Sequence, residues 1–417
     1  MNAQIISIGT ELALGQTVDT NTAWLAQKLA AVGVACAKHV TIDDQQAAIE
    51  QAIRTAANET ELVLVTGGLG PTPDDVTRQA VAAAMDVQLR FDEQSFKYIE
   101  EYFRARKRAM HPENRTQAMF PDGAKPIRNH FGTAPGFHAV VGLTDIYVMP
   151  GVPREMKMMF EQYVLPFIEE AAAGETIVQR TLHTFGMPEA EVGEKIADLM
   201  ERGRNPAVGT SAADLIISIR VNAQGATHDE AARLADVDVF ELISRLGNVV
   251  YGEGDETLAD AVAKLLIDQK KTISTAESCT GGLIAKMLTD VSGSSAYFTQ
   301  SFITYANESK HRLLGIPAEL IGQHGAVSAA VAEVMAQKCR EISDTYYALS
   351  ATGVAGPTGG TPEKPVGLVY ITLATLANVV VKELRLGEIL TRSEIRDRTA
   401  KCALNLLRLE LLKNIQR

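Results

Sequence analysis

The sequence is poor in cysteine, with four in 417 residues, and no two of them form a closely spaced pair. Zinc clusters are typically built from pairs such as CxxC, which do not occur here. Disulfide scaffolds are typical of short secreted chains, whereas this chain is long. We therefore expect neither a zinc cluster nor a disulfide framework. The four cysteines are Cys36, Cys279, Cys339 and Cys402.

Basic residues are outnumbered by acidic ones. The sequence has 40 Lys and Arg against 51 Asp and Glu, which gives a formal net charge of -11. A dedicated nucleic-acid-binding protein has a basic surplus, so nucleic acid is not an expected partner. A small anionic ligand is compatible with this charge, because a few local donors can hold a phosphate.

The sequence also lacks a long apolar run. The stretch Val366–Val381 is too short to span a bilayer and contains three polar residues. The N-terminus enters a strand-like run directly, without the basic region or cleavage site of a signal peptide. We expect a soluble, cytoplasmic protein without a membrane partner.

The overall composition is that of an ordinary globular protein, with 46% hydrophobic and 22% charged residues. A chain of this length holds two or three domains. Two breaks rich in glycine and charge, Gly174–Thr176 and Gly252–Glu256, predict the boundaries. We expect domains over residues 1–174, 175–254 and 255–417.

Strand and helix signals alternate in the first domain. Short apolar runs at Ile5–Ile8, Val34–Val40 and Leu62–Val65 predict strands, and helical patterns lie between and after them. This order predicts an α/β fold with a parallel sheet and right-handed crossovers. The middle segment has the pattern of a small α+β module. The last third is again α/β and ends in an amphipathic helix, Arg392–Asn414.

A Gly-rich turn, Thr66–Asp75, follows a buried strand and precedes a helix. Glycines let backbone amides approach an anion, and a helix N-terminus adds a partial positive charge. We expect a phosphate-binding loop with contacts from Gly67, Gly68, Gly70 and Thr72.

Aspartates accompany this loop. Asp74 and Asp75 stand at the helix start, where they either cap the helix or hold a divalent metal ion against a phosphate. Asp43 and Asp44 are expected to open the preceding helix at a neighbouring strand end. The candidate metal ligands are therefore Asp43, Asp74 and Asp75.

Polar residues follow other strands of the same sheet. Glu11 and Asn21 come after the first strand, and an open parallel sheet binds ligands outside the carboxyl ends of its strands. We expect both residues in the same site. Glu155, in the rigid turn Pro150–Met156, is either a binding residue or part of a loop that ends a strand. The basic run Arg104–Arg108 is interpreted as a solvated helix face.

The middle module contains no acid–base pair that predicts chemistry. An RNA-binding role is conceivable for a small α+β unit, but the segment has no Gly-x-x-Gly loop rich in Lys or Arg. RNA binding is therefore not favoured.

In the last domain, Ser278 stands between a strand and a helix and is followed by Thr280, Gly281 and Gly282. A hydroxyl on such a turn, with free backbone amides beside it, has the geometry that acyl transfer needs. Serine is a poor nucleophile without a nearby base. We expect Ser278 to be a nucleophile and the turn to bind substrate.

Three residues are candidates for the base: His324, Tyr305 and Lys310. Tyr305 and Lys310 are expected to reach one pocket, since one ends a strand and the other begins a helix. A lysine base needs its pKa to fall from about 10.4 to roughly 7–8. Cys279 is a rival nucleophile, but no Cys/His/Asn set accompanies it, so Ser278 is favoured.

A second Gly-rich turn, Ala351–Pro357, includes Thr352 and Gly353 and follows a strand. Together with Lys364, Arg392 and Arg396 it is a candidate site for a substrate phosphate. The alternative for each arginine is a surface position without a ligand.

These motifs resemble the CinA (competence/damage-inducible) family. In the first domain the resemblance rests on Gly9-Thr10-Glu11, Asp19-Thr20-Asn21, Thr66–Asp75 and Pro150–Glu155. In the last domain it rests on Glu277–Gly282, Thr304–Glu308, His324–Ser328 and Gly353–Gly360.

The resemblance implies that the last domain hydrolyses nicotinamide mononucleotide (NMN) to nicotinate mononucleotide and ammonia. It further implies a nucleophilic Ser278 assisted by Tyr305, Lys310 and Thr352. The motifs of this domain contain no His/Cys/carboxylate ligand set, so we expect it to need no metal or other cofactor. An arginine near the last helix is implied as well, but the family's Gly-Asp-Arg reads Gly387 to Arg392 here, so Arg392 takes that role only by approximate correspondence.

For the other domains the resemblance implies a molybdopterin-binding-like fold with metal-dependent ADP-ribose pyrophosphatase activity, followed by a KH-type module. The expected partners are NMN and ADP-ribose, and among assemblies a homodimer is favoured. An alternative from another class is a binding protein that holds a nucleotide or pterin without turnover.

Overall fold

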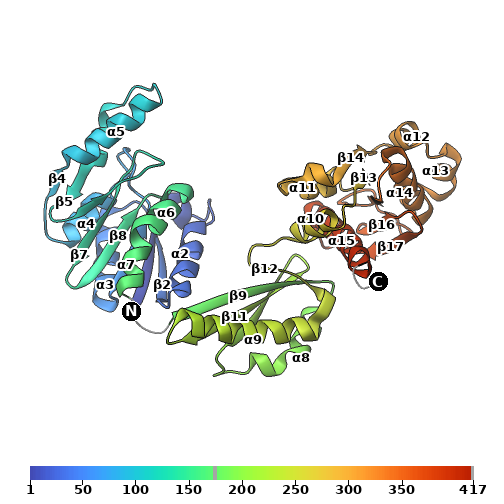
Figure 1. Cartoon of the computed structure of the whole chain (residues 1–417). Coiled ribbons are helices and arrows are strands. Elements are labelled where there is room, and N and C mark those ends of the chain that lie inside the picture. Colours follow the sequence, from blue (N-terminus) through green and yellow to red (C-terminus); the bar gives the residue numbers. More distant parts are fainter. Residues whose placement is uncertain (172–175, 415–417) are drawn as a thin grey trace. The chain divides into compact units, whose positions relative to one another are not determined.

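The computed structural model describes residues 1–171 and 176–414 (Figure 1). Most of the boundary predicted at Gly174–Thr176 lies outside these residues. Contacts divide the chain into two compact units, Met1–Gln179 with Ala223–Leu234, and Arg180–Asn222 with Ala235–Arg417. None of the described helices is long and apolar enough to cross a membrane.

The N-terminal region is built on a six-stranded mixed sheet with the order β2-β1-β3-β8-β7-β6. The pairs β1–β2, β1–β3 and β3–β8 are parallel, as the sequence predicts, whereas β8–β7 and β7–β6 are antiparallel. The antiparallel strands come from a hairpin that turns at Gly142, which the apolar runs did not reveal. The strands are β1 (Asn2–Ile8), β2 (Ala35–Ile42), β3 (Leu62–Thr66), β6 (Lys125–Ile127), β7 (Gly136–Val141) and β8 (Thr144–Met149).

Helices cover both faces of this sheet. Successive side chains on a strand point to opposite faces, so Leu62 and Leu64 enter one apolar cluster and Val63 and Val65 the other. The helical segments are α1 (Thr10–Ala13), α2 (Thr20–Ala31), α3 (Gln46–Glu59), α4 (Thr77–Ala84), α5 (Glu93–Ala105), η1 (Pro112–Ala118), α6 (Pro153–Met159), the π-helical η2 (Phe160–Val164) and α7 (Leu165–Ala171). A small ribbon pairs β4 (Leu89–Phe91) with β5 (Met119–Pro121).

Helix starts follow their capping residues. α2 begins where the Asp19 carboxylate accepts a hydrogen bond from the Thr22 amide at 2.9 Å. The next helix, α3, does not open at Asp43 and Asp44 as expected. β2 continues to Ile42, and the Asp44 carboxylate accepts hydrogen bonds from the amide and hydroxyl of Thr10 instead.

The middle region has a four-stranded sheet with the order β10-β11-β9-β12, in which β10–β11 and β12–β9 are antiparallel. Its strands are β9 (Thr176–Phe185), β10 (Ala207–Ala213), β11 (Ile216–Gly225) and β12 (Val250–Glu253). Its helical segments are α8 (Glu189–Lys195), η3 (Ala197–Met200), α9 (His228–Leu246) and η4 (Gly247–Val249).

The C-terminal region has a five-stranded sheet with the order β14-β13-β15-β16-β17. β13 is parallel to β14 and β15, and the last two strands are antiparallel additions. The strands are β13 (Ile273–Glu277), β14 (Phe298–Ile303), β15 (Tyr347–Gly353), β16 (Leu368–Ala374) and β17 (Val379–Arg385).

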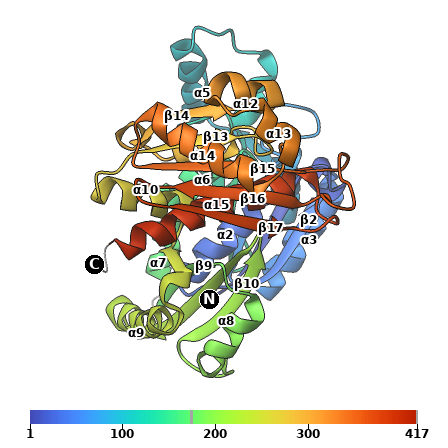
Figure 2. The same cartoon turned by 90° about the vertical axis from the view of Figure 1, so that its right-hand side faces the viewer.

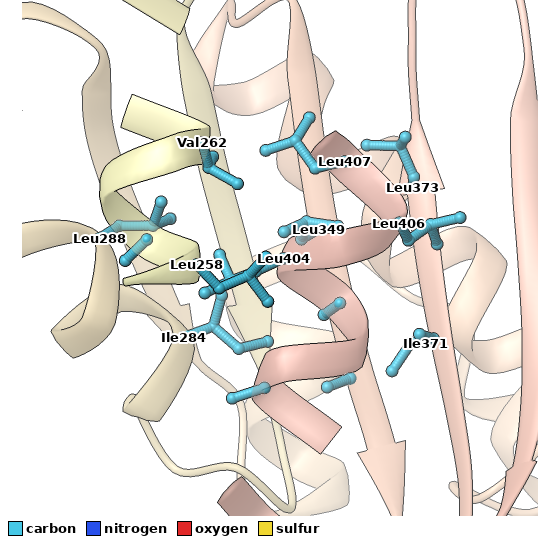
Figure 3. Packing of buried hydrophobic residues seen from close by; sticks show 14 of the residues in the cluster. Leu258, Val262, Ile284, Leu288, Leu349, Ile371, Leu373, Leu404, Leu406 and Leu407 are labelled. Atoms are coloured by element: carbon cyan, nitrogen blue, oxygen red, sulfur yellow. The ribbon is translucent and has the colours of Figure 1, made fainter. Parts of the chain in front are cut away.

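This sheet also has helices on both faces (Figure 2). On one face, Leu404 and Leu407 of α15 pack with Val262 of α10, Ile284 of α11 and Leu349 of β15 (Figure 3). A separate apolar cluster joins the other face to the helices that follow β14. The helical segments are α10 (Leu258–Asp268), α11 (Leu283–Asp290), η5 (Ser294–Ala296), α12 (Asn307–Leu314), α13 (Ala318–His324), α14 (Ala329–Ser343) and α15 (Arg392–Lys413).

Candidate active sites

Ser278 lies directly after β13, the central parallel strand of the C-terminal sheet, and its side chain is largely buried. Its amide donates a hydrogen bond to the Ala351 carbonyl of the neighbouring β15 at 2.9 Å. The turn that follows needs its glycines, because Gly281 and Gly282 have φ angles of 59° and 94°. The predicted strand-to-helix turn therefore presents Ser278 at the carboxyl edge of the sheet.

Glu277 is a site residue that the sequence analysis did not single out. Its fully buried carboxylate accepts hydrogen bonds from the amides of Gly282, Ile284 and Ala285 at 2.9, 3.1 and 2.8 Å. A helix leaves its first amides without partners, and the N-cap of α11 is a glycine with no side chain to supply one. Glu277 thus caps α11 from five residues before its N-cap.

This cap changes which amides are available to a substrate. The Gly282 amide is engaged by Glu277, and the Gly281 amide donates to the Ser278 carbonyl at 3.1 Å. Within the described residues, the amides of Cys279 and Thr280 donate to no oxygen acceptor. Both amides instead lie against the Cys279 sulfur, and neither is engaged by a carbonyl or a carboxylate of the described residues.

We expect Glu277→Gln to lower the free energy of unfolding by about 1–3 kcal/mol, because the amide group of glutamine would face buried N–H donors. Urea unfolding followed by circular dichroism measures this change. Glu308→Gln, at an exposed glutamate in the first turn of α12, is the matched control and should have little effect. Equal losses in the two variants would contradict the capping role.

Lys310 is the base candidate that lies against Ser278. It is buried, with only 1% of its surface exposed, and its Nζ lies 3.0 Å from Ser278 Oγ. Nζ also donates to the Thr304 carbonyl at 2.8 Å. Burial lowers the pKa of Lys310 from its ordinary value, because the ammonium loses its hydration. The direction of this shift is the one that a lysine base requires.

The other two base candidates do not contact Ser278. The exposed Tyr305 side chain points its hydroxyl at Arg392, whose Nη2 donates to it at 2.7 Å. His324 is exposed at the end of α13, where its carbonyl accepts a hydrogen bond from Lys364. The structure thus pairs Ser278 with Lys310, whereas the exposed Tyr305 side chain is paired with Arg392.

Arg392 and Arg396, at the start of α15, reach two different turns. Arg392 Nη1 donates to the Gly356 carbonyl at 2.7 Å, which links the second Gly-rich turn to Tyr305. Arg396 donates from Nε and Nη2 to the Thr280 carbonyl, at 3.2 and 2.7 Å. Arg396 therefore holds the nucleophile turn, a role for which the sequence offered no signal.

Three further predicted residues flank the nucleophile. The Thr352 hydroxyl donates to the Ala326 carbonyl at 2.8 Å, so its proton is committed to a neighbouring loop. Gly353 belongs to β15, which pairs closely with β16. The Thr280 hydroxyl is buried without a hydrogen-bond partner in the described residues, which leaves it for a ligand or water.

Cys279, the rival nucleophile, faces the interior. It belongs to the apolar cluster beneath the sheet, and burial raises the pKa of its thiol to about 12. A thiol with this pKa is protonated at neutral pH and is a poor nucleophile. The geometry favours Ser278.

The N-terminal region carries a cavity of about 510 Å³ at the carboxyl ends of its parallel strands. Asp44, which the sequence placed at a neighbouring strand end, also lines it, as does Gln117, which was not singled out. Asp43, Asn21 and Thr72 do not belong to the lining. The predicted residues that the cavity brings together are Glu11, Gly67, Gly68, Gly70, Asp74, Asp75 and Glu155.

The predicted metal ligands do not converge. Asp75 folds back on its own loop, where it accepts hydrogen bonds from the Gly70 and Thr72 amides at 2.7 and 2.9 Å and from the Thr72 hydroxyl. Asp43 lies outside the cavity and accepts a hydrogen bond from Gln45. The described residues include no group of three His, Cys, Asp or Glu side chains arranged to hold a metal ion. The trio Asp43, Asp74 and Asp75 therefore does not fit a metal ion.

The Gly-rich loop does offer amides to an anion. The Gly67 amide donates to Met149 and the Gly70 amide to Asp75, so these two are engaged. The amides of Gly68 and Leu69 donate to no acceptor within residues 1–171 and 176–414. Of the predicted glycines, only Gly68 therefore has an unengaged amide, and the amide of Leu69, which was not predicted, is unengaged as well.

Two buried residues support this loop from below. Asn21 donates from Nδ2 to the Gly151 carbonyl at 2.8 Å, so it joins two loops rather than facing the cavity. Arg78, 2% exposed, donates to the Leu69 carbonyl at 2.6 Å, and burial lowers its pKa to about 10. The sequence did not single out Arg78, because a single arginine in a helix is not part of any recognisable motif.

Comparisons with known proteins match each part of the chain. A "probable molybdopterin binding domain" matches residues 4–170, a "damage-inducible protein CinA KH domain" residues 179–252, and a "CinA C-terminal domain" residues 255–411. The chain thus combines a molybdopterin-binding-like α/β fold, a small KH-like unit and the CinA C-terminal fold.

Relatives match over the full length. A CinA-like protein of Geobacter sulfurreducens is 42% identical, over 99% of this chain and 100% of that protein. A putative competence-damage inducible protein of Clostridium beijerinckii is 39% identical, with the same coverage. A solved structure, competence/damage inducible protein CihA from Agrobacterium tumefaciens, is 41% identical and covers 38% of this chain and 97% of its own, with a TM-score of 0.36. Because relatives match it from end to end at this identity, the chain belongs to the CinA family.

Proposed function

We propose that the C-terminal region is an amide hydrolase that releases ammonia from NMN. The observation that carries the proposal is the 3.0 Å separation between Lys310 Nζ and Ser278 Oγ, in a buried setting that lowers the pKa of the lysine. A hydroxyl nucleophile with a neutral amine beside it is one of the recurring solutions for acyl transfer. Membership of the CinA family supports NMN as the amide.

In the proposed reaction, Ser278 Oγ attacks the carboxamide carbon while Lys310 takes the hydroxyl proton. The C–N bond then breaks, and Lys310 returns its proton to the leaving ammonia. Water hydrolyses the resulting ester, with Lys310 again as the base, and frees nicotinate mononucleotide.

Arg392 and Lys364 are the cations that we propose for the phosphate of this substrate. Arg392 joins Tyr305 to the Gly356 carbonyl, and Lys364 lies by the His324 carbonyl. We propose that these side chains orient the nucleotide, so Tyr305 acts in binding and not as the base.

The test of the proposed function is ammonia release from NMN by the purified protein with and without EDTA. Because Ser278 and Lys310 supply nucleophile and base, the rate should be equal in both; no release in either would refute the function.

We propose a second function for the N-terminal cavity, the hydrolysis of ADP-ribose. The observation that favours it is the pair of unengaged amides at Gly68 and Leu69, in a cavity large enough for a diphosphate and a sugar. Four further carboxylates, Glu11, Asp44, Asp74 and Glu155, also line it. The divalent ion that the resemblance implies stays a prediction, and no step is assigned to it, because its predicted ligands do not converge.

We expect Asp75→Ala to remove ADP-ribose cleavage and leave ammonia release from NMN unchanged. The reason is that the Asp75 carboxylate holds the Gly70–Thr72 turn with three hydrogen bonds. Liberated AMP and ammonia are measured in the same preparation.

The matched control is Asp43→Ala, because Asp43 lies outside the cavity and should affect neither product. ADP-ribose cleavage that survives in Asp75→Ala would contradict the assignment of this loop. Binding of a nucleotide or pterin without any cleavage by the unaltered protein would favour the binding-protein alternative.

The homodimer and the domain limits at 174 and 254 also stay predictions. Light scattering tests the homodimer, and limited proteolysis tests the domain limits.

A further inference from the structure

A cavity of about 650 Å³ lies between the middle region and α15, within one of the two compact units. One wall is formed by residues 185–189, at and after the end of β9, and by residues 212–217, at the tip of the β10–β11 hairpin. Arg398 and Cys402, one turn apart on α15, form the other wall. The volume is within the range of small-molecule sites, and none of the described lining residues is a predicted site residue.

The two walls of this cavity pack against a shared core. Phe185 belongs to the apolar cluster of the C-terminal sheet, and Ile216 packs against that cluster. Arg408 of α15 is buried and donates from Nη2 to the Asn248 carbonyl of η4 at 2.6 Å. The cavity is therefore bounded by elements that contact each other directly.

Arg398 places a cation in this cavity that the protein does not satisfy. Its Nε is buried without a hydrogen-bond partner, and the side chain forms no ion pair in residues 1–171 and 176–414. The neighbouring carboxylates of α15 are engaged elsewhere: Glu394 accepts hydrogen bonds from the amide and hydroxyl of Thr391, and Asp397 pairs with Lys401. Unpartnered buried donors are rare in folded proteins, so the guanidinium is available to an anionic ligand.

Apolar side chains lie across the cavity from this cation. The hairpin turn between the paired residues Ala213 and Ile216 holds Asp214 and Leu215 at φ angles of 50° and 68°. Such turns favour asparagine, aspartate and glycine, and a branched apolar residue there is uncommon. Leu215 nevertheless occupies the turn, 39% exposed, and with Met187 it offers an apolar surface to a ligand.

The charges of the lining favour a singly charged ligand. Two carboxylates, Glu189 and Asp214, line the cavity as well, and both residues are exposed to water. One guanidinium beside two carboxylates accepts a monoanion at a lower electrostatic cost than a phosphate dianion. A planar carboxylate also matches a guanidinium with two parallel hydrogen bonds.

We propose that this cavity binds a small apolar monocarboxylate. Its carboxylate pairs with Arg398, and its apolar body packs on Leu215 and Met187, so that the ligand contacts the middle region and α15 together. The site is separate from Ser278 and from the N-terminal cavity. The proposal depends on neither of the proposed hydrolysis reactions.

The test is calorimetric binding of octanoate, octyl phosphate and 1-octanol to the full chain and to two variants, Arg398→Met and Leu215→Asn. We expect the unaltered protein to bind octanoate at least about tenfold more tightly than 1-octanol, which lacks the charged partner for the guanidinium. Octyl phosphate should bind more weakly than octanoate. Arg398→Met should remove the preference for octanoate and leave 1-octanol binding within about twofold.

Leu215→Asn should weaken the binding of octanoate and 1-octanol alike, by about fourfold or more, the value of one buried methylene group. Its fold should persist, because asparagine suits a turn at positive φ better than leucine does. This variant decides the test if circular dichroism shows that Arg398→Met does not fold. The control is Arg233→Met, at an exposed arginine of α9 that does not line the cavity, and it should leave all three affinities unchanged.

Three results would overturn the monocarboxylate site. The first is octanoate that binds no more tightly than 1-octanol, or not at all at millimolar concentration. The second is an octanoate affinity that is the same in the two variants as in the unaltered protein. The third is octyl phosphate that binds more tightly than octanoate, which would assign the cavity to a different class of anion.

Discussion

Replacing Ser278 with alanine should reduce ammonia release from NMN by about a thousandfold or more, since loss of a serine nucleophile removes most of the catalysis. The fold should persist, because the hydroxyl accepts only one hydrogen bond, from Lys310. The measurement is coupled detection of ammonia, with circular dichroism and NMN binding on the same samples. Binding should be largely retained, since the alanine leaves the turn and its amides in place.

Cys279→Ala is the matched control for this variant. The thiol lies in the apolar cluster with its pKa raised to about 12, so its removal should cost some stability and leave turnover within a few fold. The opposite outcome, in which Cys279→Ala is inactive and Ser278→Ala is active, would assign the nucleophile to the thiol.

Lys310→Met should lower kcat by about 10²–10⁴-fold, the usual contribution of a positioned general base, and change KM far less. Methionine keeps an apolar side chain of similar length in the buried position but has no amine to accept a proton. Steady-state kinetics with NMN separates the two parameters. Lys364→Met is the matched control, because the Lys364 ammonium donates to the His324 carbonyl and is proposed to bind the phosphate, so its loss should change KM more than kcat.

The unaltered protein should show the corresponding pH dependence. Burial lowers the pKa of Lys310, and the neutral amine is the active form. Activity should therefore be low when the lysine is protonated and rise with pH through its lowered pKa. A profile in which activity falls over that range would contradict a lysine base.

The sequence was sufficient to predict most of the fold. Continuous apolar runs such as Leu62–Val65 indicated strands, and these prove to be covered on both faces of the sheet. The antiparallel pairing of β7 with β8 was not predicted, although β8 itself continues the parallel part of the sheet beside β3. The start of α3 was misplaced, because nothing local shows that Asp44 accepts hydrogen bonds from Thr10.

The candidate sites were predicted only in part, for a related reason. Residue types at strand ends identified Ser278, Lys310 and the Gly-rich loops, since the carboxyl ends of parallel strands meet at one edge. Which hydrogen bonds each group forms depends on partners distant in sequence. Asp75 turns to its own loop, and Tyr305 turns to Arg392, 87 residues away. Arg78 and Arg396 each donate a hydrogen bond to a loop carbonyl that no sequence motif identifies.

The cap at Glu277 has a consequence for the proposed reaction. A carboxylate that already holds three amides of the helix start fixes the end of the turn that carries Ser278. The ordering of this turn is then part of the free energy of folding. In the proposed reaction, binding energy from the nucleotide half of the substrate is free to orient the carboxamide against a preorganised nucleophile.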